Sequence, residues 1–316
     1  MLLRALERTG VFLASLAVSS VLVFGFMVLL PGDPARVALG INATEDNVIR
    51  MRHEFGLDRP LVEQYLSWVG GLVRLDPGVS YISRAQIGPQ IADRLQVSLI
   101  LVAASILIAV ALALPFGTLM AVRHRHPTGL LLSAVSQIGV AVPAFLAGIL
   151  LVTVFAIQLG WLPANSWVPP AYDPGEFLRH LLLPALSLGL VQAAVLARYV
   201  RSSVLDVLRE DFLRTARAKG LTPMRALVRH GLRNAAVPVV TVLGLQLATL
   251  LVGAVVIERV FVIPGLGSLL LDAVGNRDLI VVQDVVMVLV VAVLLVNFLV
   301  DLLYLVIDPR LRGGAR

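Results

Sequence analysis

Apolar runs separated by short polar stretches occupy most of this chain. Six of the runs have about 20 residues or more, the length that an α-helix needs to cross the hydrocarbon core of a bilayer. They lie at residues 11–30, 97–122, 130–159, 181–200, 237–257 and 281–307. The pattern predicts an all-α, polytopic membrane protein with six transmembrane helices.

The composition excludes an ordinary soluble domain. Of the 316 residues, 58% are hydrophobic and 15% are charged, whereas soluble domains carry roughly 25% charged residues. The mean hydropathy is +0.91. Cysteine is absent, which excludes disulfides, thiolate metal sites and cysteine catalysis.

The distribution of basic residues predicts the orientation of the chain. Of the 26 arginines and lysines, 16 lie in the N-terminal tail, in the loop 123–127, between residues 198 and 233, and in the C-terminal tail. Because cytoplasmic loops are enriched in basic residues, we expect these segments, and both termini, on the cytoplasmic side. The first apolar run is longer than a signal-peptide core and lacks a cleavage motif, so we expect a retained helix.

The polar stretch after the first run predicts a small helical subdomain outside the membrane. One amphipathic helix begins near Thr44 and stops at Gly56, and a second begins at Pro60. Their apolar faces are formed by Val48, Met51 and Phe55 and by Leu61, Tyr65, Trp68 and Leu72. We therefore divide the chain into a tail and first helix (1–30), an extracytoplasmic subdomain (31–94), a transmembrane domain with the remaining five helices (95–307), and a cytoplasmic tail (308–316).

The segment 205–239 is the one long polar stretch in the second half of the chain. It predicts two short amphipathic helices around Gly220, the second with Thr222 as its N-cap and Pro223 at its first position. The apolar residues that we expect to share the inner faces are Phe212, Leu213 and Ala216, and then Met224, Leu227, Val228 and Gly231 or Leu232. Arginines occupy the other side of the second helix. Such a basic pair of helices between two spans is suited to contact another protein.

The sequence shows no catalytic or metal-binding pattern. The only lysine, Lys219, has no surrounding phosphate-binding motif, and the five histidines are scattered over different loops. A DNA-binding helix-turn-helix is disfavoured at 205–239, because both flanks enter the membrane within a few residues. We therefore expect no nucleic-acid partner, whereas a purely topological loop remains an alternative for this segment.

Several polar residues lie within the predicted spans. Gln137, Gln192, Gln246 and Asn297 could line a translocation path, or they could hydrogen-bond between helices and only hold the bundle together. Asp301 is closer to a helix end and is expected to be structural. Prolines 115, 143 and 184 are expected to kink their helices.

At this point the motifs resemble a known family. Residues 214–220, RTARAKG, resemble the E-A-A-x-x-x-G loop of the membrane subunits of bacterial ATP-binding-cassette importers, in the form found in the dipeptide, oligopeptide and nickel permeases. The long first outer loop is similar to that of the first of two homologous permeases. Further resemblances are PGDP at 31–34, GLD at 56–58, QY at 64–65, Trp68, RH at 229–230, NA at 234–235, Pro238, PGLG at 264–267 and DP at 308–309.

The resemblance implies a non-catalytic translocation subunit in the bacterial inner membrane. Its fold would be the type I importer fold, with a coupling loop (205–236) that docks on a separate cytoplasmic ATPase. The coupling residues carried over from the motif are Arg214, Thr215, Ala216, Lys219, Gly220, Thr222, Pro223, Met224 and Leu227. The partners would be a second permease in a heterodimer, two ATP-binding subunits or one fused ATPase, and an extracytoplasmic binding protein. The chain itself would bind no cofactor, and ATP and magnesium would bind to the ATPase.

The match to the family motif has departures, and the cargo stays open. Arg214 replaces the usual glutamate, and the I-x-L-P ending is represented only by Leu232, with the proline displaced to Pro238. Di- or oligopeptides are the expected cargo, with nickel, glutathione or another small solute as alternatives. A self-sufficient secondary transporter or channel and an intramembrane enzyme are the other classes, for which pathway acids, clear repeats and paired catalytic groups are missing.

Overall fold

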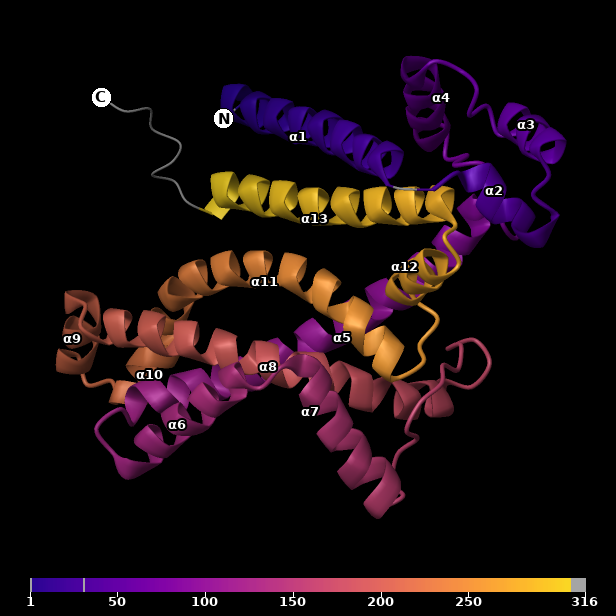
Figure 1. The fold of residues 1–316 in the computed structure, drawn as a ribbon. Helices are drawn as coiled ribbons and strands as arrows, with labels where there is room; N and C mark the ends of the chain where they lie inside the picture. Colours follow the sequence, from indigo (N-terminus) through magenta and orange to yellow (C-terminus); the bar gives the residue numbers. More distant parts are fainter. Residues whose placement is uncertain (1, 31, 308–316) are drawn as a thin grey trace. The chain divides into compact units, whose positions relative to one another are not determined.

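The structure, a computed structural model, describes residues 2–30 and 32–307, so the predicted cytoplasmic tail lies outside the described residues. These residues form helices and no strand (Figure 1). The α-helices are α1 (Leu2–Leu29), α2 (Pro34–Leu39), α3 (Glu45–Glu54), α4 (Leu61–Val73), α5 (Ile87–Val122), α6 (Pro127–Ala141), α7 (Ala144–Leu151), α8 (Pro174–Leu208), α9 (Asp211–Ala218), α10 (Pro223–Ala226), α11 (Leu232–Val260), α12 (Leu266–Gly275) and α13 (Leu279–Ile307). A 3₁₀ turn (Gly40–Asn42) follows α2, and π-helical stretches follow α7 (Val152–Gln158) and α10 (Leu227–Gly231). The all-α prediction is confirmed.

Within residues 2–30 and 32–307, five helices are long and apolar enough to cross a membrane, and a sixth span requires a bent pair. The five are parts of α1, α5, α8, α11 and α13. The run 130–159, predicted as one helix, is instead broken into α6 and a second helix that runs to Gln158, at an angle of 103°. The break falls where Val142 adopts an extended backbone before Pro143, because proline disfavours the helical conformation of the residue before it. Pro115 and Pro184 lie inside unbroken helices.

The helices exceed the hydrophobic runs that predicted them. α5 begins at Ile87, well before the predicted residue 97, and α8 covers 174–208 where 181–200 was predicted. At the start of α8, the Asp173 side chain accepts hydrogen bonds from the amides of Gly175 and Glu176, with Pro174 at the first helical position. Capping therefore extends this helix through residues too polar to be counted in a span.

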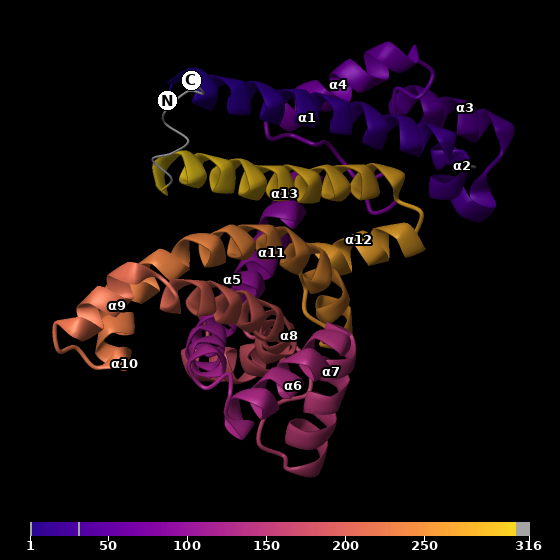
Figure 2. The same ribbon diagram turned by 90° about the vertical axis from the view of Figure 1, so that its left-hand side faces the viewer.

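The chain divides into two compact units. One contains Met1–Ser98 with Pro264–Phe298, and the other contains Leu99–Ile263 with Leu299–Arg316. In the second unit α8 and α11 lie side by side in both views (Figures 1 and 2), with α6 and α7 also packed against α8. A Cβ atom at Gly117 of α5 would lie 2.6 Å from the backbone oxygen of Ala197. This glycine therefore permits a close approach of α5 to α8, as small residues do in membrane bundles.

The first unit contains a helix that the sequence did not predict. Residues 258–279 lie between the predicted spans 237–257 and 281–307, where no helix was predicted, but α12 lies within them and is largely buried. Leu266, Leu269 and Ala273 pack into an apolar cluster with Ile87 of α5 and Val285 of α13. The helix has only 10 residues, and it begins after a Pro-Gly pair, a dipeptide that usually marks a turn. The local sequence therefore resembles that of a turn.

The two helices of the N-terminal polar segment are present as predicted. Thr44 precedes α3, and Gly56 has the positive φ of +68° that ends it. Trp68 of α4 is buried, and its indole nitrogen donates a 2.7 Å hydrogen bond to Asp284 of α13. Leu61 was expected on the inner face of α4 but is 53% exposed, because the start of this helix borders an open cleft.

Candidate functional site

The turn at Gly220 is the centre of the predicted coupling segment. Gly220 has φ of +91°, a left-handed conformation that glycine adopts without steric penalty. Its amide donates to the Arg217 carbonyl at 3.0 Å, and the amide of Leu221 donates to the Ala216 carbonyl at 3.3 Å. A Cβ atom at Gly220 would meet nothing within 4 Å. The position therefore demands glycine for its backbone conformation and not for lack of space.

The second helix of the segment begins as predicted but does not end as predicted. The Thr222 hydroxyl accepts a 3.4 Å hydrogen bond from the amide of Arg225, with Pro223 at the first helical position. α10 then continues through the π-helical turn into α11 without a loop. The expected short, separate helix is therefore continuous with a candidate membrane span, as Figure 2 shows at one end of α8 and α11.

The segment is fastened to its unit by a buried apolar face. Leu213, Ala216, Ala226 and Leu227 are buried in a cluster that includes Val204 of α8. Gly231 lets the segment pack closely, since a Cβ atom there would lie 2.7 Å from Leu227 and 3.2 Å from Val207.

Three residues predicted on the inner faces point outward instead. Phe212 is 39% exposed, Met224 55% and Val228 56%. Phe212 precedes buried Leu213 and so lies about 100° away around the helix. The π-helical turn from Leu227 to Gly231 changes the helical phase, which accounts for the exposure of Val228.

The exposed face of the segment combines these apolar residues with positive charge. Arg214 is exposed and pairs with exposed Asp211 at 3.3 Å, and the Thr215 hydroxyl donates to the Asp211 carbonyl at 3.0 Å. The other predicted coupling residues that are exposed are Lys219, Gly220, Thr222, Pro223 and Met224. Ala216 and Leu227 are buried, so they position the turn and are not available to a partner.

The four polar residues proposed for a pathway differ in their surroundings. Gln246 of α11 is buried, and its side-chain amide donates a 3.4 Å hydrogen bond to the Gln192 carbonyl of α8. The side-chain oxygen of Gln246 is buried without a hydrogen-bond partner. Gln137 is exposed on α6, and Asn297 is half-buried on α13 in the other unit. The structure thus brings Gln192 and Gln246 together.

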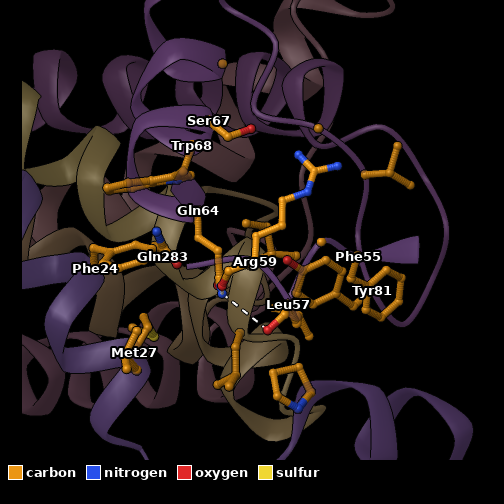
Figure 3. Close-up of a pocket in the computed structure, with 18 of the residues that line it drawn as sticks. Phe24, Met27, Phe55, Leu57, Arg59, Gln64, Ser67, Trp68, Tyr81 and Gln283 are labelled. Atoms are coloured by element: carbon orange, nitrogen blue, oxygen red, sulfur yellow. Dashed lines mark hydrogen bonds between the residues drawn. The ribbon is translucent and has the colours of Figure 1, made fainter. Parts of the chain in front are cut away.

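Sequence reasoning missed a polar cleft in the first unit. It has a volume of about 1130 Å³ and is lined by residues of α1, α4, α13 and the turns at 52–59 and 74–81. Figure 3 shows Phe24, Trp68 and Gln283 gathered on one side of it and stacked Phe55 and Tyr81 on the other. The aromatic residues of the N-terminal polar segment were the available signal, but nothing local in the sequence joins them to residue 283.

A bundle of membrane-spanning helices with a basic, exposed turn between two spans defines a subunit of a membrane transport system. Comparison with protein families identifies which system. Residues 113–313 match the family described as binding-protein-dependent transport system inner membrane component, and residues 1–102 match its N-terminal region. The chain therefore belongs to this family and is a permease of the ABC importer type.

Individual relatives agree with this assignment. The chain is 41% identical over 316 residues to the glutathione transport system permease protein GsiC of Escherichia coli (strain K12), covering 99% of both chains. It is equally similar, at 41% identity and 99% coverage of both chains, to the protein of that name from Shigella dysenteriae serotype 1 (strain Sd197). A solved structure, "Crystal structure of an amino acid ABC transporter with histidines", matches with a TM-score of 0.53 and 18% identity, over 68% of this chain and 92% of that chain. This last likeness concerns the fold alone.

Proposed function

We propose that this permease imports peptides or peptide-like solutes by alternating access, driven by a separate ATPase that binds the turn around Gly220. The observation that supports this proposal most is the turn itself. It presents apolar and basic side chains outward while its other face is fixed to a membrane bundle. An exposed mixture of this kind is typical of a surface that another protein covers.

The packing of the turn explains how a push on it would be transmitted. Leu213 and Leu227 contact the cluster that contains Val200 and Val204 of α8, and α10 is continuous with α11. A displacement of the turn would therefore move the ends of two spanning helices together. Packed helices shift as rigid bodies between discrete arrangements, which is the motion that alternating access requires.

The remaining partners and the orientation belong to the same proposal. We expect a second permease, two ATP-binding subunits or one fused ATPase that bind ATP and magnesium, and an extracytoplasmic binding protein. Both termini would lie in the cytoplasm. The cargo proposal rests on the glutathione permeases named above, and nickel or another small solute is the alternative.

The decisive experiment tests whether uptake depends on the left-handed backbone conformation at Gly220. Proteoliposomes that contain the permease with its cognate ATPase and second permease are supplied with the cognate binding protein and tested for ATP-dependent uptake of radiolabelled glutathione and of a dipeptide. Gly220→Val forces a β-branched residue into a left-handed conformation, which costs about 1–2 kcal/mol. We expect uptake to fall about 5- to 30-fold, while the amount of protein in the membrane is unchanged.

Asparagine is the matched control at this position, since it tolerates positive φ better than other side chains. Gly220→Asn should retain most of the uptake. Unchanged uptake by Gly220→Val would refute the coupling role. Gradient-driven uptake by this chain alone, without an ATPase, would instead favour a secondary transporter.

A further inference from the structure

The cleft in the first unit has the size of a ligand site. Its volume of about 1130 Å³ is slightly above the range of roughly 300–1,000 Å³ for small-molecule pockets. It can therefore hold a solute as large as a tripeptide. Its lining comes from helices and turns of one compact unit, so its shape does not depend on the other unit.

Two aromatic pairs form the apolar part of the cleft. The rings of Phe24 and Trp68 stack at a centroid distance of 6.1 Å, and those of Phe55 and Tyr81 stack at 4.1 Å. Burial raises the pKa of Tyr81 to about 12, with the carboxylates of Asp284 and Asp278 adding to the effect. Its phenol therefore keeps its proton at all physiological pH values. The Phe55 ring also lies under the Arg84 guanidinium, 4.8 Å from the ring centroid, so the ring edges of these pairs form the apolar surface for a ligand side chain.

Gln283 supplies a buried donor that lacks an acceptor. The residue is 7% exposed, and its side-chain nitrogen is buried without a hydrogen-bond partner. Figure 3 shows it in the cleft beside Phe24 and Trp68. Buried donors are nearly always paired, so a turn of the Gln283 side-chain amide toward the cleft would let an acceptor on a bound solute complete the pair.

In the part of the chain that the structure describes, three arginines and three acidic residues line the cleft, and ion pairs occupy two of the acids, which leaves Asp76 as the one carboxylate not in an ion pair. Asp33 is bound by Arg52 at 2.8 Å, and Glu54 is bound at 2.8 Å by Arg84 from outside the cleft. Within the described residues, the guanidinium groups of Arg59 and Arg74, which also line the cleft, form no ion pair and no hydrogen bond.

The backbone that carries Arg59 is fixed before any ligand binds. The side-chain amide of Gln64 donates hydrogen bonds to the backbone carbonyls of Leu57 at 3.2 Å and Arg59 at 2.8 Å. Figure 3 shows the bond to Leu57. Gly56 provides the left-handed turn that precedes them, with φ of +68°. A fixed turn that presents an uncommitted guanidinium is a preorganised carboxylate site.

We propose that this cleft binds a small solute that carries a carboxylate next to an apolar or aromatic side chain. Arg59 contacts the carboxylate, Gln283 donates to a second acceptor such as a peptide carbonyl, and the aromatic pairs hold the side chain. This goes beyond the proposed coupling function, because it places solute recognition in the N-terminal unit of the permease itself.

Equilibrium dialysis of the full-length chain in lipid nanodiscs tests this proposal. The probe is tritiated Ala-Phe-Ala with a free carboxylate, and its C-terminal amide is the matched control ligand. We expect saturable binding of the acid, with at least about tenfold weaker binding of the amide. Arg59→Gln should weaken binding of the acid by the same factor, and Gln283→Leu should weaken binding of both ligands. Arg50→Gln, a change at an exposed arginine outside the cleft, should leave both affinities unchanged.

Three results would overturn the proposal. They are equal affinity for acid and amide, equal affinity of the unmodified chain and Arg59→Gln, and absence of saturable binding at millimolar probe. No ATPase is present in the dialysis, so these outcomes are independent of the uptake assay. If the chain binds the probe but Gly220→Val does not change uptake, the coupling proposal fails. If Gly220→Val lowers uptake but the chain does not bind the probe, the cleft proposal fails.

Discussion

The hydrogen bond between Trp68 and Asp284 should be a main support of the N-terminal unit. Asp284 is 0% exposed, its Oδ1 accepts from the indole at 2.7 Å, and its Oδ2 is buried without a partner. Trp68→Phe retains an aromatic ring against Phe24 but removes this donor. Removing the donor leaves a buried side-chain acceptor without a partner, which costs about 1–3 kcal/mol. We therefore expect a loss of about 2 kcal/mol.

Thermal unfolding followed by circular dichroism in detergent measures this loss. At about 2–4 °C per kcal/mol for units of this size, the Tm should fall by roughly 4–8 °C. Trp161→Phe is the control, because Trp161 is 62% exposed and should change Tm by less than about 2 °C. A double-mutant cycle with Asp284→Leu isolates the pair. If Trp68→Phe costs as much in the Asp284→Leu background as alone, the hydrogen bond is not the cause and the reasoning is wrong.

Three further predictions concern other parts of the molecule. Gly117→Val should lower the free energy of unfolding by about 1–3 kcal/mol, since its Cβ would lie 2.6 Å from the backbone oxygen of Ala197. Gly25→Ala is the control and should change the Tm little, because a Cβ atom there would meet nothing within 4 Å. In a spectrophotometric titration, Tyr81→Phe should remove a tyrosine whose pKa is about 12. Because folding raises the Tyr81 pKa from 10.0 to about 12, its contribution to stability is present below pH 10 and is lost toward pH 12. Gln246→Leu should change the Tm by less than about 5 °C. If Gln246 lines the pathway, the substitution should also change the uptake rate. Unchanged uptake would show that Gln246 contributes only to helix packing.

Local signals in the sequence predicted local structure well. The N-cap Thr222, the left-handed Gly220 and the start of α3 after Thr44 were each identified from residue type and spacing. Each of these features is decided by interactions within about four residues, so one stretch of sequence contains the whole cause.

Features that depend on distant residues were missed or misread. α12 is not predicted by the sequence pattern, because its burial depends on contacts with α5 and α13. The continuation of α10 into α11 runs through a π-helical turn that hydrophobic spacing does not predict. The cleft combines Phe24, Arg59, Tyr81 and Gln283 from four separate segments. Hydrophobic periodicity describes one element at a time, so it cannot report such a combination.

Some residues of the coupling segment are buried and others are exposed. Substitutions at the two kinds of position should cause different defects, a loss of stability or a loss of partner binding, which the sequence motif alone does not distinguish. Ala216 and Leu227 belong to the buried cluster, so enlarging or truncating them perturbs the packing of the turn on α8 and lowers stability. Met224 and Lys219 are exposed, so replacing them leaves the packing intact and can affect function only through whatever covers that face. If replacing an exposed residue lowers uptake while the free energy of unfolding stays the same, a partner surface is required to explain the loss. If only replacements of buried residues lower uptake, the packing of the helices explains the loss without a partner.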